Sequence, residues 1–295
     1  MCYNSIMMTQ EKAFAKLNIS LDITNKRDDG YHDMIMVMQT VSLFDEISIE
    51  ENGSGFFKTE TGLSYLPNDD RNLGTKAAKA FYADAGIDGL GAEIKIKKTI
   101  PVGAGMAGGS ADAAAVLRAL NRMHGYPLDN DAILKTAARV GSDVAFCVLG
   151  GTALAKGRGE ILESLPELPD CSILIAKPSF SVSTPELFAA VDKRKIKAHP
   201  DTAGIEQCLA ESDIDGLCRR MFNVFEEVPD RRMRTVGEIK RKMLESGAKG
   251  AIMTGTGSAV FGIYDADAKL EQMRAELKKE YGFCVIARPV GRLLP

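Results

Sequence analysis

A glycine-rich segment that runs directly into a helix-forming segment constrains this chain more than any other feature. Residues 101–112 read Pro-Val-Gly-Ala-Gly-Met-Ala-Gly-Gly-Ser-Ala-Asp, and residues 113–120 consist mainly of alanine and leucine. Glycine lets backbone N–H groups approach a ligand closely, because no Cβ stands in the way. A helix that begins there adds unpaired N–H groups and the positive end of its dipole. The segment therefore predicts a phosphate-binding loop at the start of a helix.

Other interpretations of this loop depend on the rest of the chain. Residues 103–108 match the G-x-G-x-x-G of dinucleotide-binding proteins, but that fold needs a second strand that ends in an acidic residue. Asp129 has a suitable separation, yet Pro-Leu-Asp-Asn-Asp around it is typical of a turn and a helix cap. A Walker A loop requires Gly-Lys, a dipeptide that this chain lacks. From the loop alone, a glycine-rich turn that binds no ligand remains an alternative.

Composition excludes several classes of protein. The 295 residues carry a net charge of −3, so no basic surface for nucleic acid is indicated. No apolar run reaches the ~20 residues of a membrane helix, and residues 1–8 lack the basic start and apolar core of a signal peptide. Six cysteines without a C-x-x-C pair predict reduced thiols in a cytoplasmic protein, and with only three histidines we expect no side-chain metal site.

Apolar periodicity predicts an α+β protein with two lobes and a cleft between them. In the first part we expect strands at 13–24, 34–41, 45–50 and 92–97, helices at 73–85, 113–120 and 132–139, and an apolar strand at 144–149. In the second part we expect strands at 172–176, 251–254, 259–264 and 284–287, helices at 185–191 and 266–279, and two or three helices within 203–246. We place the domain boundary between 1–165 and 166–295.

Lys16 and Asp143 are the candidate catalytic residues. Lys16 lies within a segment of alternating apolar residues. It is either a solvated residue on the outer face or a cleft lysine that offsets phosphate charge. Asn18 shares its face and is placed to hold a substrate hydroxyl. Asp143 follows Gly-Ser and precedes an apolar run, so it is either a cap or a carboxylate that accepts a hydroxyl proton.

Two further loops are candidates for ligand contacts. Tyr31 and His32 follow Asp-Gly, and the pair is either structural or suited to stacking on a base and hydrogen bonding to it. The second glycine turn, Thr-Gly-Thr-Gly-Ser at 254–258, is either a tight hairpin or a second backbone face near the phosphates. Residues alone leave both alternatives open.

The order of these motifs resembles that of the GHMP small-molecule kinases. They carry an N-terminal strand with a functional polar residue, a P-x-x-x-G-L-x-x-S-S-A loop before a helix, and a C-terminal glycine turn. The segments that carry the resemblance span nearly the whole chain: 15–21, 27–32, 101–114, 141–144, 183–185 and 253–258. Met106 replaces the usual leucine, a conservative change. Ala111 replaces the second serine, so Ser110 is left as the loop hydroxyl.

The resemblance implies transfer of a phosphoryl group from ATP, with Mg²⁺, to the tertiary 2-hydroxyl of a methylerythritol that carries cytidine diphosphate. Asp143 would be the base, Lys16 its partner, and Asn18 a substrate contact. Tyr31 and Phe188 would flank the cytosine. His32 would read its edge, and Thr184 would also contact the substrate. The implied ATP-binding residues are Pro101, Gly103, Ala104, Gly105, Met106, Ala107, Gly108, Gly109 and Ser110.

The implied fold is a ribosomal-protein-S5-like N-terminal domain (1–165) for ATP binding and catalysis and a ferredoxin-like C-terminal domain (166–295) for substrate binding, with the active site in the cleft between them. Two alternatives remain. One is a GHMP kinase for homoserine, mevalonate or a sugar, which the A-K-L-N and D-G-Y-H segments disfavour. The other is a nucleotide-binding module without catalysis, which the presence of both Lys16 and Asp143 disfavours. Neither nucleic acid nor membrane is an expected partner.

Overall fold

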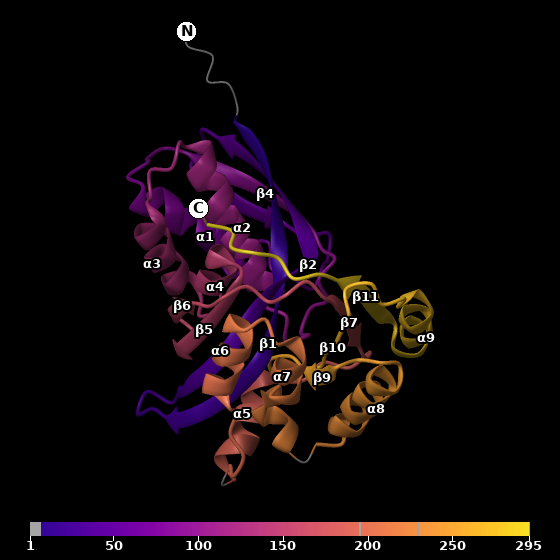
Figure 1. The fold of residues 1–295 in the computed structure, drawn as a ribbon. Helices are drawn as coiled ribbons and strands as arrows, with labels where there is room; N and C mark the ends of the chain where they lie inside the picture. The colour runs from indigo at the N-terminus through magenta and orange to yellow at the C-terminus, as the bar shows by residue number, and fades with distance from the viewer. Residues whose placement is uncertain (1–6, 195, 229, 295) are drawn as a thin grey trace.

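Two β-sheets of different size organise the chain (Figure 1). The computed structural model describes residues 7–194, 196–228 and 230–294. The larger sheet has the order β3-β4-β2-β1-β8, with β5 added on β2 and β6 on β5. Its strands are β1 (Met8–Lys26), β2 (His32–Asn52), β3 (Phe57–Glu60), β4 (Gly91–Lys97), β5 (Thr152–Gly157), β6 (Ile161–Ser164) and β8 (Phe222–Asn223).

The smaller sheet, of order β11-β7-β10-β9, belongs to the C-terminal part of the chain. Its strands are β7 (Ser172–Lys177), β9 (Gly250–Met253), β10 (Val260–Tyr264) and β11 (Phe283–Ala287). All of its neighbouring strands are antiparallel. Two sheets with their own helices confirm the predicted α+β class.

The helices divide between the two sheets. In the N-terminal part these are α1 (Leu73–Asp84), α2 (Gly108–Met123), α3 (Asn130–Val140) and α4 (Val144–Leu149). The C-terminal part holds α5 (Thr184–Asp192), α6 (Thr202–Ala210), α7 (Ile214–Arg219), the 3₁₀ turn η1 (Val224–Glu227), α8 (Arg232–Glu245) and α9 (Glu271–Tyr281). Helices α8 and α9 pack on the smaller sheet, and α2 packs on β1 of the larger one (Figure 1). No helix within the described residues is long and apolar enough to cross a membrane.

The long hairpin β1–β2 brings the candidate lysine to the centre of the molecule. The register between the two strands shifts between Phe14 and Lys16 and again between Asn18 and Ser20, and such irregularities re-aim side chains. The polar face of β1 is not solvated, because Lys16, Asn18 and Ser20 are all buried. The C-terminal part of the chain contacts this segment, because β8 pairs in parallel with β1 at Ser20 and the Asn18 N–H donates to Thr254 Oγ1.

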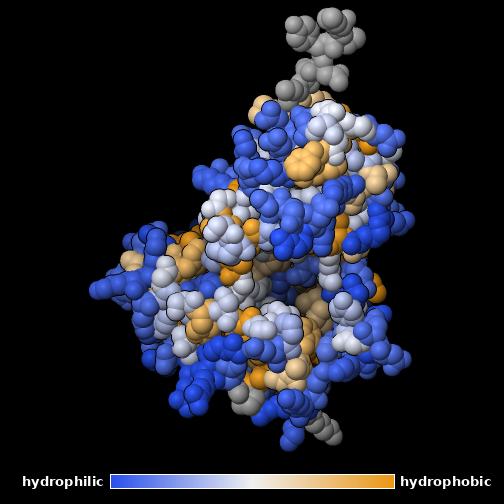
Figure 2. Space-filling model, turned by 180° about the vertical axis from the view of Figure 1, so that it is seen from behind, coloured by the Kyte–Doolittle hydropathy of each residue, from blue (hydrophilic) through white to orange (hydrophobic). Residues whose placement is uncertain are grey.

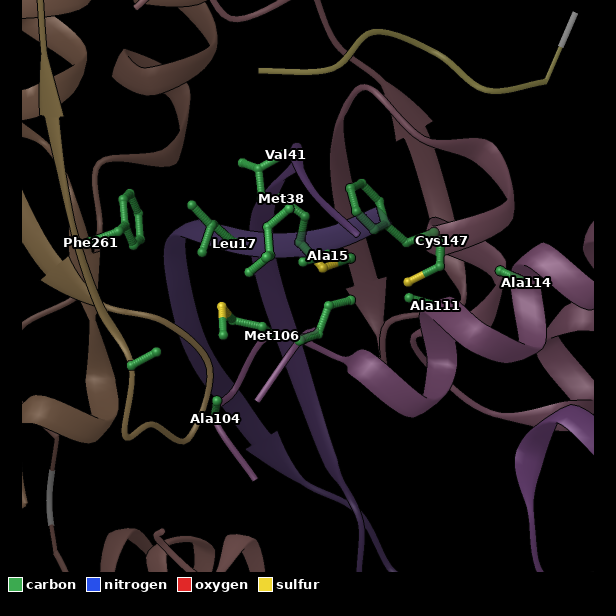
Figure 3. Packing of buried hydrophobic residues seen from close by; sticks show 14 of the residues in the cluster. Ala15, Leu17, Met38, Val41, Ala104, Met106, Ala111, Ala114, Cys147 and Phe261 are labelled. Carbon is green, nitrogen blue, oxygen red and sulfur yellow. The ribbon is translucent and has the colours of Figure 1, made fainter. Parts of the chain in front are cut away.

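The glycine-rich loop is anchored in the hydrophobic core by two of its apolar side chains. Ala104 and Met106 are both almost fully buried. Met106 lies in the same cluster as Leu17 of β1 and Met38 of β2 (Figure 3). The loop therefore presents its backbone to the cleft while these side chains fix it from behind.

Several predicted elements differ from the structure. Residues 144–149 form the helix α4, not a strand, because a short apolar run has no period that separates a buried helix from a buried strand. The two strands predicted at 34–41 and 45–50 are one strand, β2, and α9 begins five residues later than predicted, at Glu271 instead of Ala266. Strands β3, β5, β6 and β8 were not predicted.

The dinucleotide interpretation is wrong. Helix α2 is followed by α3 and α4 instead of a strand. Asp129 caps α3, since its carboxylate accepts a hydrogen bond from the backbone N–H of Ala132 at 2.8 Å. Cys147, Cys171, Cys208, Cys218 and Cys284 are free and buried, whereas Cys2 lies outside the described residues.

Candidate active site

A cleft of about 960 Å³ gathers most of the predicted site residues from distant parts of the chain. Those that line it are Lys16, Tyr31, His32, Pro101, Gly103, Ala104, Gly105, Met106, Ala107, Gly108, Gly109, Ser110, Asp143, Thr184 and Phe188. The face shown in Figure 2 is hollowed at its centre, between an upper and a lower part. Of the predicted residues, Asn18 does not line the cleft.

The two glycine turns support each other by direct backbone contact. Gly105 has φ +75°, and a Cβ there would lie 2.1 Å from the carbonyl oxygen of Thr254. In return, a Cβ on Gly255 would lie 2.8 Å from the carbonyl oxygen of Gly105. Only glycine fits both positions. Ala107 precedes α2 at φ +56° and makes no side-chain cap, so the first N–H groups of α2 stay free for an anion.

Lys16 is held by its own strand and by the glycine loop. Its Nζ donates to the Asn18 side-chain oxygen at 2.6 Å and to the carbonyl oxygen of Gly105 at 3.1 Å. Asn18 is fully buried, and its backbone N–H donates to Thr254 Oγ1 at 3.0 Å. Asn18 was predicted to contact the substrate, but it lies behind Lys16, so its side chain is placed to orient the lysine instead.

Asp143 presents an uncommitted carboxylate to the cleft. It occupies the position before α4, yet its side chain does not cap that helix. Within the described residues, Asp143 makes no side-chain hydrogen bond and no ion pair, with Lys16 or with any other cation. Gly159 lies beside it, since a Cβ there would be 3.6 Å from Asp143 Oδ1. A carboxylate that is free at a cleft wall can accept a proton from a bound hydroxyl.

The other end of the cleft is aromatic. His32 is mostly buried and stacks on Phe188 with ring centroids 4.8 Å apart and an interplanar angle of 27°. His32 Nε2 lies 2.6 Å from Asp192 Oδ1, and Lys26 donates to the other oxygen of the same carboxylate. These two partners hold the pKa of Asp192 below its usual value. Phe188 was predicted to flank the cytosine. In the structure, His32 already stacks on one face of the Phe188 ring.

Tyr31 and Thr184 complete this end. Tyr31 is 56% exposed, and the guanidinium carbon of Arg158 lies 4.5 Å from its ring centroid. Thr184 Oγ1 is 3.0 Å from Thr256 Oγ1, which links the start of α5 to the second glycine turn. Asp192, Arg158 and Thr256 line the cleft and were not singled out in the sequence. Thr256 could have been found from its position between two glycines. Nothing in the sequence distinguishes Asp192 and Arg158 from the other acids and arginines of the chain.

A buried charge cluster supports the glycine loop from below. Lys98 Nζ lies 2.5 Å from Asp45 Oδ2 and 2.6 Å from Asp112 Oδ2. Burial, with a contribution from the neighbouring Asp45 carboxylate, raises the pKa of Asp112 to about 8, although the attraction of Lys98 lowers it. Asp45 also accepts from the backbone N–H of Ile100 at 2.8 Å, which fixes the chain just before the loop. In the sequence, Lys98 is one of two adjacent lysines shortly before Pro101. Only the fold shows that it lies between two buried carboxylates.

Comparison with known proteins identifies the family. A family model described as "GHMP kinases N terminal domain" matches residues 72–151, and one described as "GHMP kinases C terminal" matches residues 205–282. The chain belongs to the GHMP kinase family. A Clostridium novyi protein named 4-diphosphocytidyl-2-C-methyl-D-erythritol kinase is 38% identical over 279 residues, which cover 95% of this chain and 99% of that protein.

Solved GHMP kinases share the whole fold. A crystal structure titled 4-(cytidine 5'-diphospho)-2C-methyl-D-erythritol kinase superposes with a TM-score of 0.80 at 30% identity, covering 96% of this chain and 100% of that one. A homoserine kinase from Cytophaga hutchinsonii gives a TM-score of 0.74 at 19% identity, covering 100% of this chain and 98% of that one. The second likeness shows the fold alone, so the fold of a GHMP kinase does not by itself choose the acceptor.

Proposed function

We propose that this GHMP kinase transfers the γ-phosphoryl group of ATP to the 2-hydroxyl of 4-diphosphocytidyl-2-C-methyl-D-erythritol, a step in isoprenoid precursor synthesis. One observation carries the proposal: a single cleft holds the glycine loop, the uncommitted Asp143 carboxylate and the aromatic end with Tyr31 and His32. A substrate with a nucleobase at one end and a hydroxyl acceptor at the other fits that arrangement. The names of relatives that match nearly the full length support the same acceptor.

The proposed roles follow from the geometry. The backbone of residues 103–110 and the start of α2 bind the triphosphate, because these residues line the cleft and no side chain caps the first turn of the helix. Asp143 accepts the hydroxyl proton. Lys16, held by Asn18, places a positive charge beside the loop where negative charge develops during transfer. Tyr31, His32, Thr184 and Phe188 bind the cytidine end.

Magnesium is proposed as the counter-ion of the triphosphate. Mg²⁺ in such sites keeps several waters and binds one or two carboxylates plus substrate phosphates. Within the described residues, no three His, Cys, Asp or Glu side chains converge on a common point. The cleft therefore fits an ion held mainly by phosphate oxygens, with the Ser110 hydroxyl as a protein ligand. The ion would neutralise phosphate charge during transfer.

We propose domains 1–165 and 166–295, with ATP binding and catalysis in the first and substrate binding shared between them. The chain leaves the larger sheet after β6 and enters the smaller sheet at β7, which supports this division. Tyr31 and His32 come from the first part while Thr184 and Phe188 come from the second, so the substrate pocket spans both. We also propose that the enzyme acts in the cytoplasm as a small-molecule kinase, with no nucleic acid or membrane partner.

The first test measures ADP release by the purified protein with Mg-ATP and four acceptors: the cytidyl compound, homoserine, mevalonate and galactose. We expect turnover with the cytidyl compound alone. Turnover with another acceptor would replace the proposed substrate and keep the kinase chemistry. Binding of ATP without turnover of any acceptor would favour a non-catalytic nucleotide-binding module.

Asp143→Asn tests the proposed base. Because the amide cannot accept the proton, we expect kcat to fall by roughly 10²–10⁴-fold, while ATP affinity measured by calorimetry stays nearly unchanged. Asp131→Asn, which changes an exposed acid of α3, is the matched control and should keep full activity. An Asp143→Asn variant with most of its kcat would remove Asp143 from the proposal.

A further inference from the structure

One cation of the cleft, Arg158, has no role in the proposed chemistry. It lies in the turn between β5 and β6 and is half-buried. Its guanidinium carbon is 4.5 Å from the ring centroid of Tyr31, which fixes the side chain over the aromatic end of the cleft. Only its backbone N–H is engaged by a carboxylate, that of Glu160 at 2.7 Å. Within the described residues, its guanidinium has no hydrogen-bond acceptor and no anionic partner.

The other cations of the cleft wall are committed. Lys98 lies between two buried carboxylates, and Arg71 forms an ion pair with Asp69 at 2.9 Å. Lys16 donates to an amide oxygen and a backbone carbonyl beside the glycine loop. Arg158 is thus the lining cation, among the residues that the structure describes, whose donors remain free for a ligand. A guanidinium offers a planar fork of N–H donors that matches phosphate oxygens.

The turn that carries Arg158 also reaches the proposed base. Gly159 follows it at φ +113°, and a Cβ at that position would lie 3.6 Å from Asp143 Oδ1 and 3.4 Å from the Met36 side chain. One turn therefore contacts Tyr31 through residue 158 and borders Asp143 through residue 159. The turn therefore borders the part of the cleft between the aromatic end and the Asp143 carboxylate.

We propose that Arg158 binds the diphosphate of the acceptor substrate. This inference rests on the proposed function, in which the cytidine end lies at Tyr31 and the reacting hydroxyl at Asp143. In that substrate the diphosphate joins the two ends, so it must cross the stretch of cleft that the 157–160 turn borders. Arg158 then has two contacts: the Tyr31 ring, which holds the guanidinium in place, and the phosphate oxygens, which take its free donors.

The test compares cytidine with cytidine diphosphate as ligands, measured by calorimetry while a non-hydrolysable ATP analogue saturates the ATP site. In the wild-type protein, cytidine diphosphate should bind more tightly than cytidine. Arg158→Gln should weaken cytidine diphosphate by roughly 10- to 100-fold, and cytidine by less than about 3-fold, because only the diphosphate loses a charged partner. The KM for the cytidyl substrate should rise by a similar factor while the KM for ATP is unchanged.

Two variants make the result specific. Lys156→Gln removes a cation two residues earlier, on β5, which pairs with Glu163 at 3.8 Å, and should leave both affinities unchanged. Arg158→Lys keeps the charge without the planar fork and should bind cytidine diphosphate with intermediate affinity. It also provides a second folded variant if Arg158→Gln is unstable.

The outcomes separate this inference from the proposed function. If both variants of Arg158 bind cytidine diphosphate as the wild type does, or lose cytidine and cytidine diphosphate equally, Arg158 does not bind the diphosphate. The wild-type protein would still turn over the cytidyl substrate in either case. If the wild-type protein phosphorylates another acceptor instead, the proposed function fails first and this inference fails with it.

Discussion

Asn18 shows how a residue without access to the cleft can govern its chemistry. Its side-chain oxygen accepts from Lys16 Nζ at 2.6 Å, and its own backbone N–H is tied to Thr254. Without that oxygen, the ammonium keeps one described acceptor, the Gly105 carbonyl. The lysine would then sample other positions during phosphoryl transfer. In the proposed mechanism, Asn18 therefore acts through Lys16 as a positioning residue.

Asn18→Ala should accordingly lower kcat by roughly 10-fold, the order expected for one lost hydrogen bond to a charged group. The KM values for both substrates should stay within about 3-fold, because Asn18 does not line the cleft. Steady-state kinetics with each substrate varied in turn measures the split. Ser20→Ala is the control on the same strand, since the Ser20 hydroxyl is buried without a partner and its removal should be neutral. A raised KM at unchanged kcat would restore the substrate contact first predicted for Asn18.

At the scale of elements, the glycine turns at 103–109 and 254–258 act as one unit. The loop before α2 and the turn between β9 and β10 meet at Gly105 and Thr254, from opposite sheets of the molecule. The left-handed backbone and the close carbonyl both require glycine at 105. Gly125 is a useful comparison, because it has nearly the same φ, +72°, and open space where a Cβ would go.

Gly125→Ala should therefore lower the free energy of unfolding by about 1–2 kcal/mol, the cost of a left-handed backbone for alanine. Gly105→Ala adds an overlap with the Thr254 carbonyl that neither backbone can relieve without moving the loop. We expect a loss of more than about 3 kcal/mol and at least roughly 10-fold weaker ATP binding. Urea unfolding and calorimetry measure the two effects. Equal losses in both variants would show that the close contact between the turns contributes nothing.

Local sequence predicted the elements whose signals are local. The turn and cap around Asp129, the glycine loop and the strands that alternate in hydrophobicity are all present. Residues 144–149 failed because burial on every side erases the period that distinguishes helix from strand. The burial of Lys16 depends on contacts that are distant in sequence, such as the Gly105 carbonyl 89 residues away.

The same limit applies to the candidate site. Its motif residues were predicted because a known family carries them in the same order. Asp192 and Arg158 were not predicted, because their significance comes from partners that only the fold places beside them, such as His32 for Asp192 and Tyr31 for Arg158. Asn18 was predicted as a cleft residue because alternation assigns a face, and it cannot tell which residue on that face is covered by another.

At the scale of the whole molecule, the C-terminal tail ties the two sheets together. After β11 the chain leaves the smaller sheet and runs back over the larger part (Figure 1). The Val290 N–H donates to the Thr40 carbonyl at 2.9 Å, and the Leu293 N–H donates to the Leu149 carbonyl at 2.8 Å. Leu294 is buried at the end of this path. The tail therefore holds the end of α4, whose first residue follows Asp143.

Removing the chain from residue 289 onward should lower the free energy of unfolding by roughly 3–5 kcal/mol, from the lost hydrogen bonds and the burial of Leu294. Because α4 loses its restraint while the glycine loop keeps its own contacts, kcat should fall more than ATP affinity does. Urea unfolding, kinetics and calorimetry of the truncated chain give the three quantities. Arg292→Ala is the control, since that side chain is exposed and its backbone stays in place, and it should change stability by no more than about 0.5 kcal/mol. A truncated protein as stable and active as the full chain would mean that the contacts outside residues 289–295, such as those of β8 with β1 and of Arg288 with Ser42, are enough to join the sheets.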